Sequence, residues 1–503
     1  MSTVAQTIVI GSGIGGLATA ALLQHRRPDE HVLVLEAHTV SGGCASAYDR
    51  YIRIDKSEQK LRVRLDVGAT TLSGLGGTRP VQRLLDELGL ALDAVPMDPG
   101  ISIMLQNGTI VRRHADPARW YDESSRVFGE RSIGFWKEID AIAARAWEVS
   151  SRYPRFPFAS ATDIIASGLR FRLSDLRLLH FARTPLVTIL RNHGLAEDAR
   201  FREFVDQLLM ISVQCTSSEA STLVAALGLE YPAHTFYVNG GLYAFAELLE
   251  RSLVDRGGAI QHKTRITAID YDRSRKRFIV TDSKERRYEC DRLISNATIW
   301  NTAELLRTVP QSLKQQLQRA ISKPYGEHWG AMMMTGVIGD SIDDGGSLYH
   351  QYHTSFGSLF ISLSHRGDTL RAPLGYRTIS VSSHEPNASR WQMMDNQTYA
   401  RTQQEVLKRF DRVLRERLPG YADAEKLLLE MGTPKTFEFY THRKHGWVGG
   451  IAHSVKNWMP RWQPNVTALD GFYLVGDTVF PGQGTPAVVQ SAMNLCDRIA
   501  SRN

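Results

Sequence analysis

The chain has 503 residues, of which 43% are hydrophobic and 22% are charged, a composition typical of folded globular proteins and not of disordered ones. This length exceeds what a single hydrophobic core usually supports, so it predicts at least two domains. Lys and Arg outnumber Asp and Glu by 60 to 53, and the net charge of +7 is too small to indicate a nucleic-acid-binding protein, although it suits an anionic membrane surface.

The cysteines and histidines exclude two further classes. The four cysteines lie far apart, which predicts neither a disulfide framework nor a zinc site, and no acids or cysteines beside the histidines complete a set of metal ligands. The first apolar run, at 7–10, is too short for a signal peptide, and about 18 consecutive uncharged apolar residues occur nowhere. We therefore expect a cytoplasmic protein without a metal, either soluble or attached to the inner face of a membrane.

The N-terminal residues predict a strand, a helix and a second strand. Residues 6–10 form a short apolar run, 15–25 are rich in small helix-forming residues, and 32–36 form a second apolar run that ends in an acid. The turn between the first strand and the helix, at 11–16, matches the G-x-G-x-x-G pattern. This order and spacing are typical of the βαβ unit that binds a dinucleotide.

The glycines of this turn have physical roles in such a unit. Gly11 permits the tight turn, Gly13 lets a pyrophosphate approach the backbone, and Gly16 lets the helix pack closely on the strand, with Gly15 completing the glycine-rich start of the helix. The helix N-terminus then presents free N–H groups to the phosphates. Glu36 is placed to accept hydrogen bonds from both ribose hydroxyls of the adenosine, and its charge would repel the 2′-phosphate of NADP.

The rest of the chain alternates between strand-rich and helix-rich segments. In chain order we expect a hairpin at 50–66, helices over 120–234, a helix at 245–254 followed by strands to about 300, strands over 345–383, and an amphipathic helix at 397–418. Within the helical region, one face combines Trp136, Ile139, Ile142, Ala143 and Ala146. The chain ends with a strand at 472–475, a glycine-rich loop and a helix.

This ending favours FAD over NAD as the dinucleotide. Thr485 is a plausible N-cap for the last helix and Pro486 suits its first position, so the positive end of this helix would lie against the N1–C2=O edge of a flavin. Gly42 and Gly43 follow Glu36 closely, where FAD-binding folds often carry a second pair of glycines near the phosphates.

These residues resemble the carotenoid desaturase/isomerase family of flavoproteins, which includes phytoene desaturases, carotenoid 3′,4′-desaturases, carotenoid isomerases and retinol saturases. The matching segments are the opening turn, 66–75 (DVGATTLSGL), 237–241 with the helix and strand after it, and 476–492 (GDTVFPGQGTPAVVQSA). Residues 66–75 are most similar to the 3′,4′-desaturase branch. Good matches cover about a third of the chain, nearly all of it cofactor domain.

The resemblance implies an α/β fold with a discontinuous, Rossmann-like FAD-binding domain and an inserted α+β substrate domain, similar to flavin amine oxidases. The expected ranges are 1–100, 235–300 and 430–503 for the first domain, and 101–234 and 301–429 for the second. It also implies that Gly476 and Asp477 contact the ribityl–phosphate region of FAD, that the Ile266 backbone pairs with adenine, and that Ala487 and Val488 lie near the isoalloxazine.

The function that the resemblance implies is desaturation of a carotenoid or similar polyene, with hydride transfer to flavin N5. Isomerisation and saturation on the same scaffold stay open, as does the electron acceptor, oxygen or a quinone. Amine oxidation is disfavoured because this chain has Gly43-Cys44 where amine oxidases usually have Gly-Gly-Arg. A prenyl-lipid escort protein is disfavoured by the intact glycines and Glu36. No catalytic residue can be named: Cys44 is better interpreted as a small residue beside the cofactor, and Asp66 as a cap of nearby backbone N–H groups.

Two segments are candidates for membrane contact. Residues 169–191 combine apolar and arginine side chains on a predicted amphipathic helix, with Ser174 as a possible cap, which suits a membrane interface as well as an ordinary surface helix. The resemblance favours the membrane, because carotenoids dissolve in lipid. The second segment contains Trp447, Trp458, Met459 and Trp462, interleaved with basic residues, and is also suited to a substrate tunnel or a core.

Overall fold

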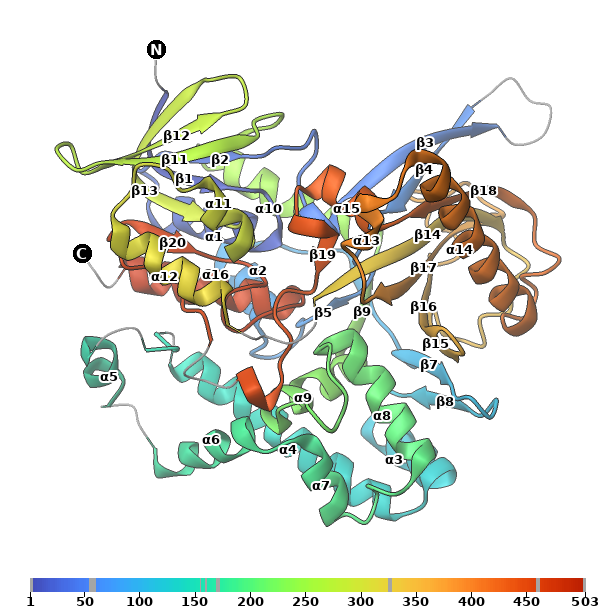
Figure 1. The fold of residues 1–503 in the computed structure, drawn as a ribbon. Helices are drawn as coiled ribbons and strands as arrows, with labels where there is room; N and C mark the ends of the chain where they lie inside the picture. Colours follow the sequence, from blue (N-terminus) through green and yellow to red (C-terminus); the bar gives the residue numbers. More distant parts are fainter. Residues whose placement is uncertain are drawn as a thin grey trace.

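The structure, a computed structural model, describes residues 3–53, 60–153, 155–158, 161–168, 172–323, 328–457 and 462–500 (Figure 1). A seven-stranded sheet carries the N-terminal unit. Its strands run in the order β10 (Ala259–Gln261), β2 (Val32–Leu35), β1 (Thr3–Ile10), β13 (Arg287–Ser295), β12 (Arg277–Asp282) and β11 (Ile266–Asp272), and β20 (Phe472–Leu474) pairs with the end of β13. The central pairs are parallel and their strands are buried on both faces, which is why β2 is a continuous apolar run. The predicted βαβ unit is confirmed.

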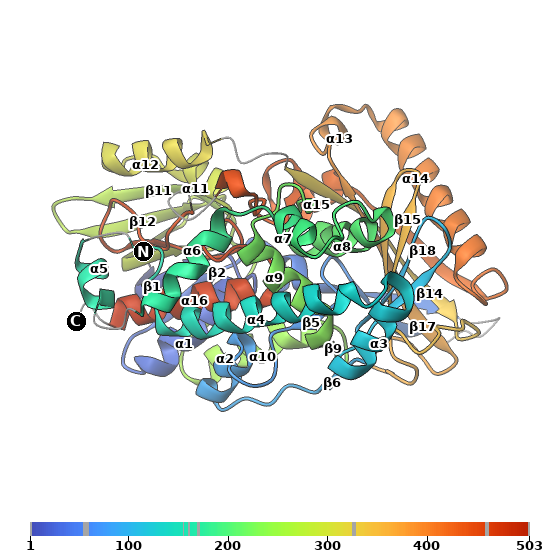
Figure 2. The same cartoon turned by 90° about the horizontal axis from the view of Figure 1, so that it is seen from below.

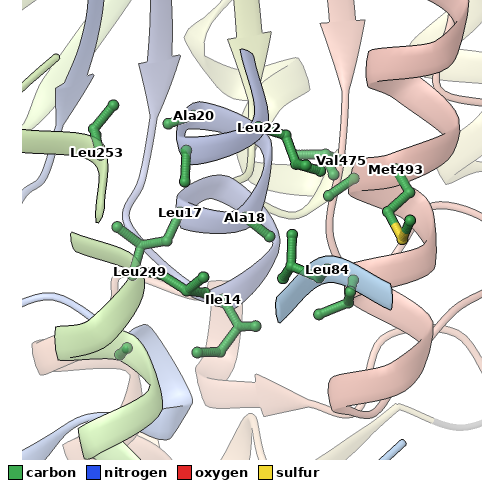
Figure 3. Close-up of a cluster of buried hydrophobic side chains, with 14 of the residues drawn as sticks. Ile14, Leu17, Ala18, Ala20, Leu22, Leu84, Leu249, Leu253, Val475 and Met493 are labelled. Atoms are coloured by element: carbon green, nitrogen blue, oxygen red, sulfur yellow. The ribbon is translucent and has the colours of Figure 1, made fainter. Parts of the chain in front are cut away.

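Four helices cover one face of this sheet. They are α1 (Ile14–Arg26), α2 (Pro80–Leu88), α10 (Tyr243–Asp255) and α16 (Thr485–Ala500). Figure 3 shows their shared core, in which Leu17 and Ala18 of α1 lie among Leu84, Leu249 and Met493 from the other helices. The alanines of α1 have small side chains, so this helix packs closely on the sheet. The close packing holds the glycine-rich turn at the carboxyl end of β1.

The opposite face carries α11 (Ile299–Leu305) and α12 (Gln311–Ile321). Leu313 and Leu317 of α12 are fully buried in a cluster with Ile8 of β1 and Leu33 of β2. Residues just after 300 therefore pack with the dinucleotide-binding sheet, beyond the expected boundary at 300. The remaining domain boundaries stay a prediction.

An eight-stranded sheet forms the second half, on the right in Figure 1. Its order is β18 (Lys426–Gly432), β14 (Trp329–Gly339), β17 (Tyr376–Glu385), β16 (Gly357–Leu363), β15 (Tyr349–Thr354), β7 (Ile101–Met104) and β8 (Ile110–Arg113), with β19 (Trp447–Val448) beside the start of β14. The predicted helix at 397–418 is α14 (Asn396–Arg417), which packs on one face of the sheet through Phe410 and Leu414.

Helices form a third layer along one side of both sheets, as Figures 1 and 2 show. They are α3 (Pro117–Phe128), α4 (Arg131–Arg152), α5 (Ala161–Gly168), α6 (Leu176–Arg183), α7 (Leu186–Asn192), α8 (Ala199–Ser212) and α9 (Thr222–Glu230). The predicted helical region is thus confirmed, and the apolar face of α4 predicted from Trp136 to Ala146 is buried throughout. No helix in the described ranges has both the length and the apolar character that a membrane crossing requires.

The smaller elements join these layers. A hairpin of β3 (Ala47–Arg53) and β4 (Lys60–Asp66) confirms the one expected at 50–66, whose tip at 54–59 lies outside the described residues. A small sheet combines β5 (Leu72–Ser73), β9 (Thr235–Val238) and β6 (Ala94–Pro96). Two short helices, α13 (Arg390–Met393) and α15 (Pro434–Thr441), contact each other, and α15 packs against β14, β18 and β19 of the eight-stranded sheet.

Candidate active site

A cavity of about 1780 Å³ lies between the two sheets and the helical layer. Ligand pockets usually enclose roughly 300–1,000 Å³, so this cavity has room for a dinucleotide and a second ligand. The sequence-predicted cofactor residues that line it come from both ends of the chain and from its middle: Gly11, Gly13, Gly15, Glu36, Gly43, Ile266, Gly476, Asp477, Ala487 and Val488. The structure therefore brings these residues together, while their individual contacts with a cofactor stay a prediction.

Gly16 is the predicted residue that does not line the cavity. A Cβ atom added to Gly16 would lie 2.2 Å from the carbonyl oxygen of Gly11, so a side chain here would push α1 away from β1. This close approach is the packing role expected for the last glycine of the pattern.

Asn296 belongs to the cradle and was missed in the sequence. It follows β13 directly, its N–H donates to the carbonyl of Ile10 at 2.9 Å, and its carboxamide lies against the glycine-rich turn. Cβ atoms added to Gly13, Gly15 or Gly476 would each lie 2.9 Å from an Asn296 side-chain atom. The available signal was its position at the carboxyl end of a strand parallel to β1, where ligands bind in open α/β sheets.

The Glu36 carboxylate is held in place at the end of β2. Its Oε2 accepts hydrogen bonds from the backbone N–H of Ser12 at 2.8 Å and the Ser12 hydroxyl at 2.6 Å, and its Oε1 accepts from the backbone N–H of His38 at 2.7 Å. Oε2 thus has both of its acceptor positions occupied, whereas Oε1 keeps one for a ribose hydroxyl, and the contact with a ribose stays a prediction.

The second pair of glycines approaches the first. Gly42 and Gly43 both have positive φ angles, 104° and 58°, and the Gly42 N–H donates to the carbonyl of Ser12 at 2.8 Å. Cys44 follows and lines the cavity, where burial raises the pKa of its thiol and the charge of Arg443 opposes that rise. A protonated thiol is consistent with the interpretation of Cys44 as a small residue beside the cofactor.

Asp477 pairs with an arginine that the sequence did not indicate. The Arg443 guanidinium donates to Asp477 Oδ2 at 2.6 Å and to the carbonyl of Trp447 at 2.5 Å, and both charged side chains line the cavity.

The last helix begins one residue earlier than predicted: the Val488 N–H donates to the carbonyl of Gly484, so Thr485 is the first helical residue and not the N-cap. The difference leaves the helix N-terminus at the cavity wall.

This set of residues fits an FAD molecule. Backbone alone lines the strand–helix turn, since side chains there would meet Asn296, and a carboxylate stands at the end of the second strand. Loops from both ends of the chain extend the cradle over a length that suits two linked nucleotide halves. The fold and this site define an FAD-dependent oxidoreductase.

The chain belongs to the flavin containing amine oxidoreductase family, whose sequence profile matches residues 14–500. A chloroplastic prolycopene isomerase of Daucus carota is 25% identical over 521 residues, covering 98% of this chain and 80% of that protein. A 4,4′-diaponeurosporene oxygenase of Staphylococcus aureus is 24% identical over 282 residues, covering 53% of this chain and 55% of that protein.

Solved structures show the same fold. Wild-type putrescine oxidase bound to putrescine superposes with a TM-score of 0.63 at 15% identity, covering 100% of both chains. A fatty acid isomerase of P. acnes that produces CLA has a TM-score of 0.60 at 13% identity, covering 98% of both chains. The inferred Rossmann-like fold with a second α+β half is thus confirmed.

The cavity continues from the cradle between the helices of the third layer. Its wall here is mainly apolar and comes from α4, α6 and α9 and the segment before α5, with Trp147, Phe158, Leu178, Leu223 and Leu227 among the lining residues. Such a wall offers few hydrogen bonds, so it is suited to a long apolar ligand.

The opposite wall is one face of the eight-stranded sheet. A single row of paired residues crosses five strands and lines the cavity: Gln351, Phe360, Ser382, Met333 and Gly432. We call this wall the sheet floor. Polar and apolar side chains are mixed on this wall. In the sequence these residues belong to strands of ordinary composition, and nothing there marks the face as one that meets a ligand.

Asp66 is not part of the cavity wall. Its Oδ2 accepts a hydrogen bond from the Arg371 guanidinium at 2.5 Å, and both side chains are almost completely buried. The expectation that Asp66 caps nearby backbone groups is therefore wrong, because its recorded partner is a distant arginine. Its role is to neutralise a buried cation.

The possible metal ligands and the tryptophans of the second candidate segment remain to be placed. In the described part of the chain, no group of three His, Cys, Asp or Glu side chains is arranged to hold a metal. Trp447 packs against the core of the seven-stranded sheet, whereas Trp462 lines the cavity and stacks on Phe480. Trp458 and Met459 lie outside the described residues, as do 169–171 of the predicted amphipathic segment.

Proposed function

We propose that this chain is an FAD-dependent desaturase of a carotenoid or a similar polyene isoprenoid. The observation that carries the proposal is the continuity of the dinucleotide cradle with a long, mainly apolar cavity branch. A polyene is a rod-like apolar molecule, and such a branch would align it along its length beside the cradle. Relatives named for prolycopene and diaponeurosporene support the same class of substrate.

The chain's own contribution is to position the substrate and exclude water. When bound, FAD supplies the acceptor for a hydride taken from an allylic carbon. The helical wall and the sheet floor hold the neighbouring carbons in line with that acceptor, and a substrate fixed in a reactive geometry needs little further assistance. We expect oxygen or a quinone as the final electron acceptor.

Isomerisation is the second candidate, because the alignment with a prolycopene isomerase covers 98% of this chain, at 25% identity. Purified protein mixed with liposomes that carry lycopene, prolycopene or a hydroxylated acyclic carotenoid separates the candidates. Desaturation yields a product two hydrogens lighter, isomerisation one of equal mass, and saturation one two hydrogens heavier. We expect the lighter product, and the absence of change in every polyene would contradict the proposal. Repeating the assay under argon, with and without a quinone, identifies the electron acceptor.

We also propose that the protein lies on the cytoplasmic face of a membrane and takes its substrate from the bilayer. The segment around α5 and α6, at the lower left in Figure 1, combines a cavity wall with exposed apolar side chains. Phe158, Ile164 and Leu179 line the cavity and are also 38%, 58% and 38% exposed. Nearby Ile165 and Leu173 are 73% and 80% exposed. Exposed Arg172, Arg177 and Arg183 suit contact with lipid phosphates.

Replacing Ile165 and Leu173 with aspartate should release the protein from membranes. Two exposed apolar side chains that would enter the membrane interface become charged, so we expect binding to vesicles containing anionic lipid to fall at least roughly tenfold in a sedimentation assay. Leu374→Asp is the matched control, because Leu374 is 75% exposed but lies outside this segment. Equal binding by all three proteins would contradict the membrane proposal.

A further inference from the structure

His384 is a cavity-lining imidazole on the sheet floor that has no hydrogen-bond partner among the described residues. It lies on β17, opposite Ala331 of β14, and both residues line the cavity. Among the described residues, its ring packs edge-on against Trp329, with the ring centroids 5.7 Å apart. The ring is partly exposed although it lies deep in the molecule. Both ring nitrogens are therefore available to a ligand.

Two cavity-lining carboxylates, Glu430 and Asp175, have partners. Glu430 accepts hydrogen bonds from Tyr48 at 2.7 Å and Arg50 at 3.0 Å. Asp175 accepts from Arg152 at 2.9 Å and from Tyr153 at 2.8 Å. These carboxylates are committed to ion pairs or hydrogen bonds, so neither is a free proton acceptor.

Besides His38, which follows Glu36 at the ribose end of the cradle, two other histidines line the cavity but are less well placed. His442 lies near Glu36 and Arg265, at the ribose end of the cradle. His453 is 7% exposed and its ring packs directly on Gly482, with Nδ1 buried and without a partner in the described residues. Neither combines an accessible ring with a position on the sheet floor.

His384 also lies at the end of the sheet that approaches the cradle. Beside it, Trp329 and Gly330 of β14 pair with Val448 and Trp447 of β19. The chain continues from Val448 into Gly450, where an added Cβ would lie 2.1 Å from the carbonyl oxygen of Asp477. A short backbone path thus connects the strand beside His384 to the FAD-binding loop.

We propose that His384 is a catalytic residue that accepts the proton released in the desaturation. This inference rests on the proposed function. A hydride leaves one allylic carbon for FAD, the C–H bond of the adjacent carbon breaks, and its electron pair forms the new C=C bond. The proton passes to an imidazole nitrogen of His384 and then to water. The substrate is oxidised and FAD is reduced.

The charge state of the imidazole agrees with this role. Burial lowers the pKa of His384 to about 4, so the ring is neutral at pH 7 and carries a free lone pair. A weak base is sufficient here, because the substrate carbon next to the departing hydride becomes electron-poor and strongly acidic.

The test is the rate of flavin bleaching under argon, measured with the carotenoid that the wild-type protein converts. We expect His384→Ala to slow bleaching by roughly 10²–10⁴-fold, the range for removal of a general base, while substrate binding and the oxidised FAD spectrum are unchanged. Added imidazole should restore part of the rate, which a merely structural role would not allow. His384→Asn, closer in shape, provides the same test if the alanine variant does not fold.

The control is His365→Ala, since His365 is exposed and does not line the cavity. Bleaching in a His384 variant at the wild-type rate, or a slow rate that imidazole does not raise, would overturn the inference and leave the desaturase function intact. Failure of the wild-type protein to bleach with any polyene would instead overturn the proposed function, and this inference with it.

Discussion

Replacing Gly13 with valine should yield a protein that folds but retains no FAD. A Cβ atom at this position would lie 2.9 Å from the Asn296 carboxamide, and a branched side chain would also fill the space that a pyrophosphate needs beside the backbone. We expect affinity for FAD to fall at least roughly a hundredfold, because one misplaced side chain removes several backbone hydrogen bonds to the phosphates. The ratio of flavin to protein absorbance after purification measures this directly.

Gly168→Ala is the matched control for this prediction. A Cβ added to Gly168 meets no atom within 4 Å, and its φ is not in the left-handed region, so the substitution should leave bound FAD unchanged. A Gly13→Val protein that retains a full complement of flavin would show that the cofactor does not lie along this turn. Circular dichroism of both variants separates loss of the cofactor from loss of the fold.

Replacing Asp66 with asparagine should produce the largest loss of stability. The Asp66–Arg371 pair is buried, with side chains 2% and 3% exposed, so the substitution removes the carboxylate paired with this interior cation. Breaking such a pair typically costs about 3–5 kcal/mol in the free energy of unfolding. Denaturant titration followed by tryptophan fluorescence measures this change.

Two controls make the Asp66 result interpretable. Glu405→Gln breaks the Arg401–Glu405 pair, whose side chains are 72% and 60% exposed, and should cost less than about 1 kcal/mol. The double variant Asp66→Leu with Arg371→Met should recover much of the loss, because a buried pair replaced by apolar residues is often neutral. If Asp66→Asn lowers the free energy of unfolding as little as Glu405→Gln does, the structural role of Asp66 is contradicted. A loss of turnover at unchanged stability would instead favour Asp66 as an acid catalyst.

The dinucleotide half was predictable because its evidence is local. A strand, three glycines, a helix and an acid follow one another within 36 residues, and each has a physical reason to occur at its position. The exact cap of α16 was missed by one residue, since Gly484 and Thr485 both suit a helix start. Such an error changes no contact of the cradle.

Several other residues of the site were not predictable to the same depth, because their evidence is distant in the sequence. Asp66 and Arg371 are separated by 305 residues, and nothing near Asp66 marks its partner. Asn296 and Arg443 reach the cradle only through the pairing of strands and the packing of loops. His384 has neighbours of ordinary strand composition, so only the register of β14, β17 and β19 indicates that it faces the cavity near the FAD-binding loop.

The most direct test of the account is the stoichiometry of a single turnover without an electron acceptor. Purified protein with its bound flavin is mixed under argon with liposomes that carry the polyene, and the flavin spectrum and the mass of the recovered polyene are measured together. We predict one molecule of polyene that is two hydrogens lighter for each flavin bleached. An unchanged flavin spectrum with every polyene, or a bleached flavin beside a polyene of unchanged mass, would contradict it.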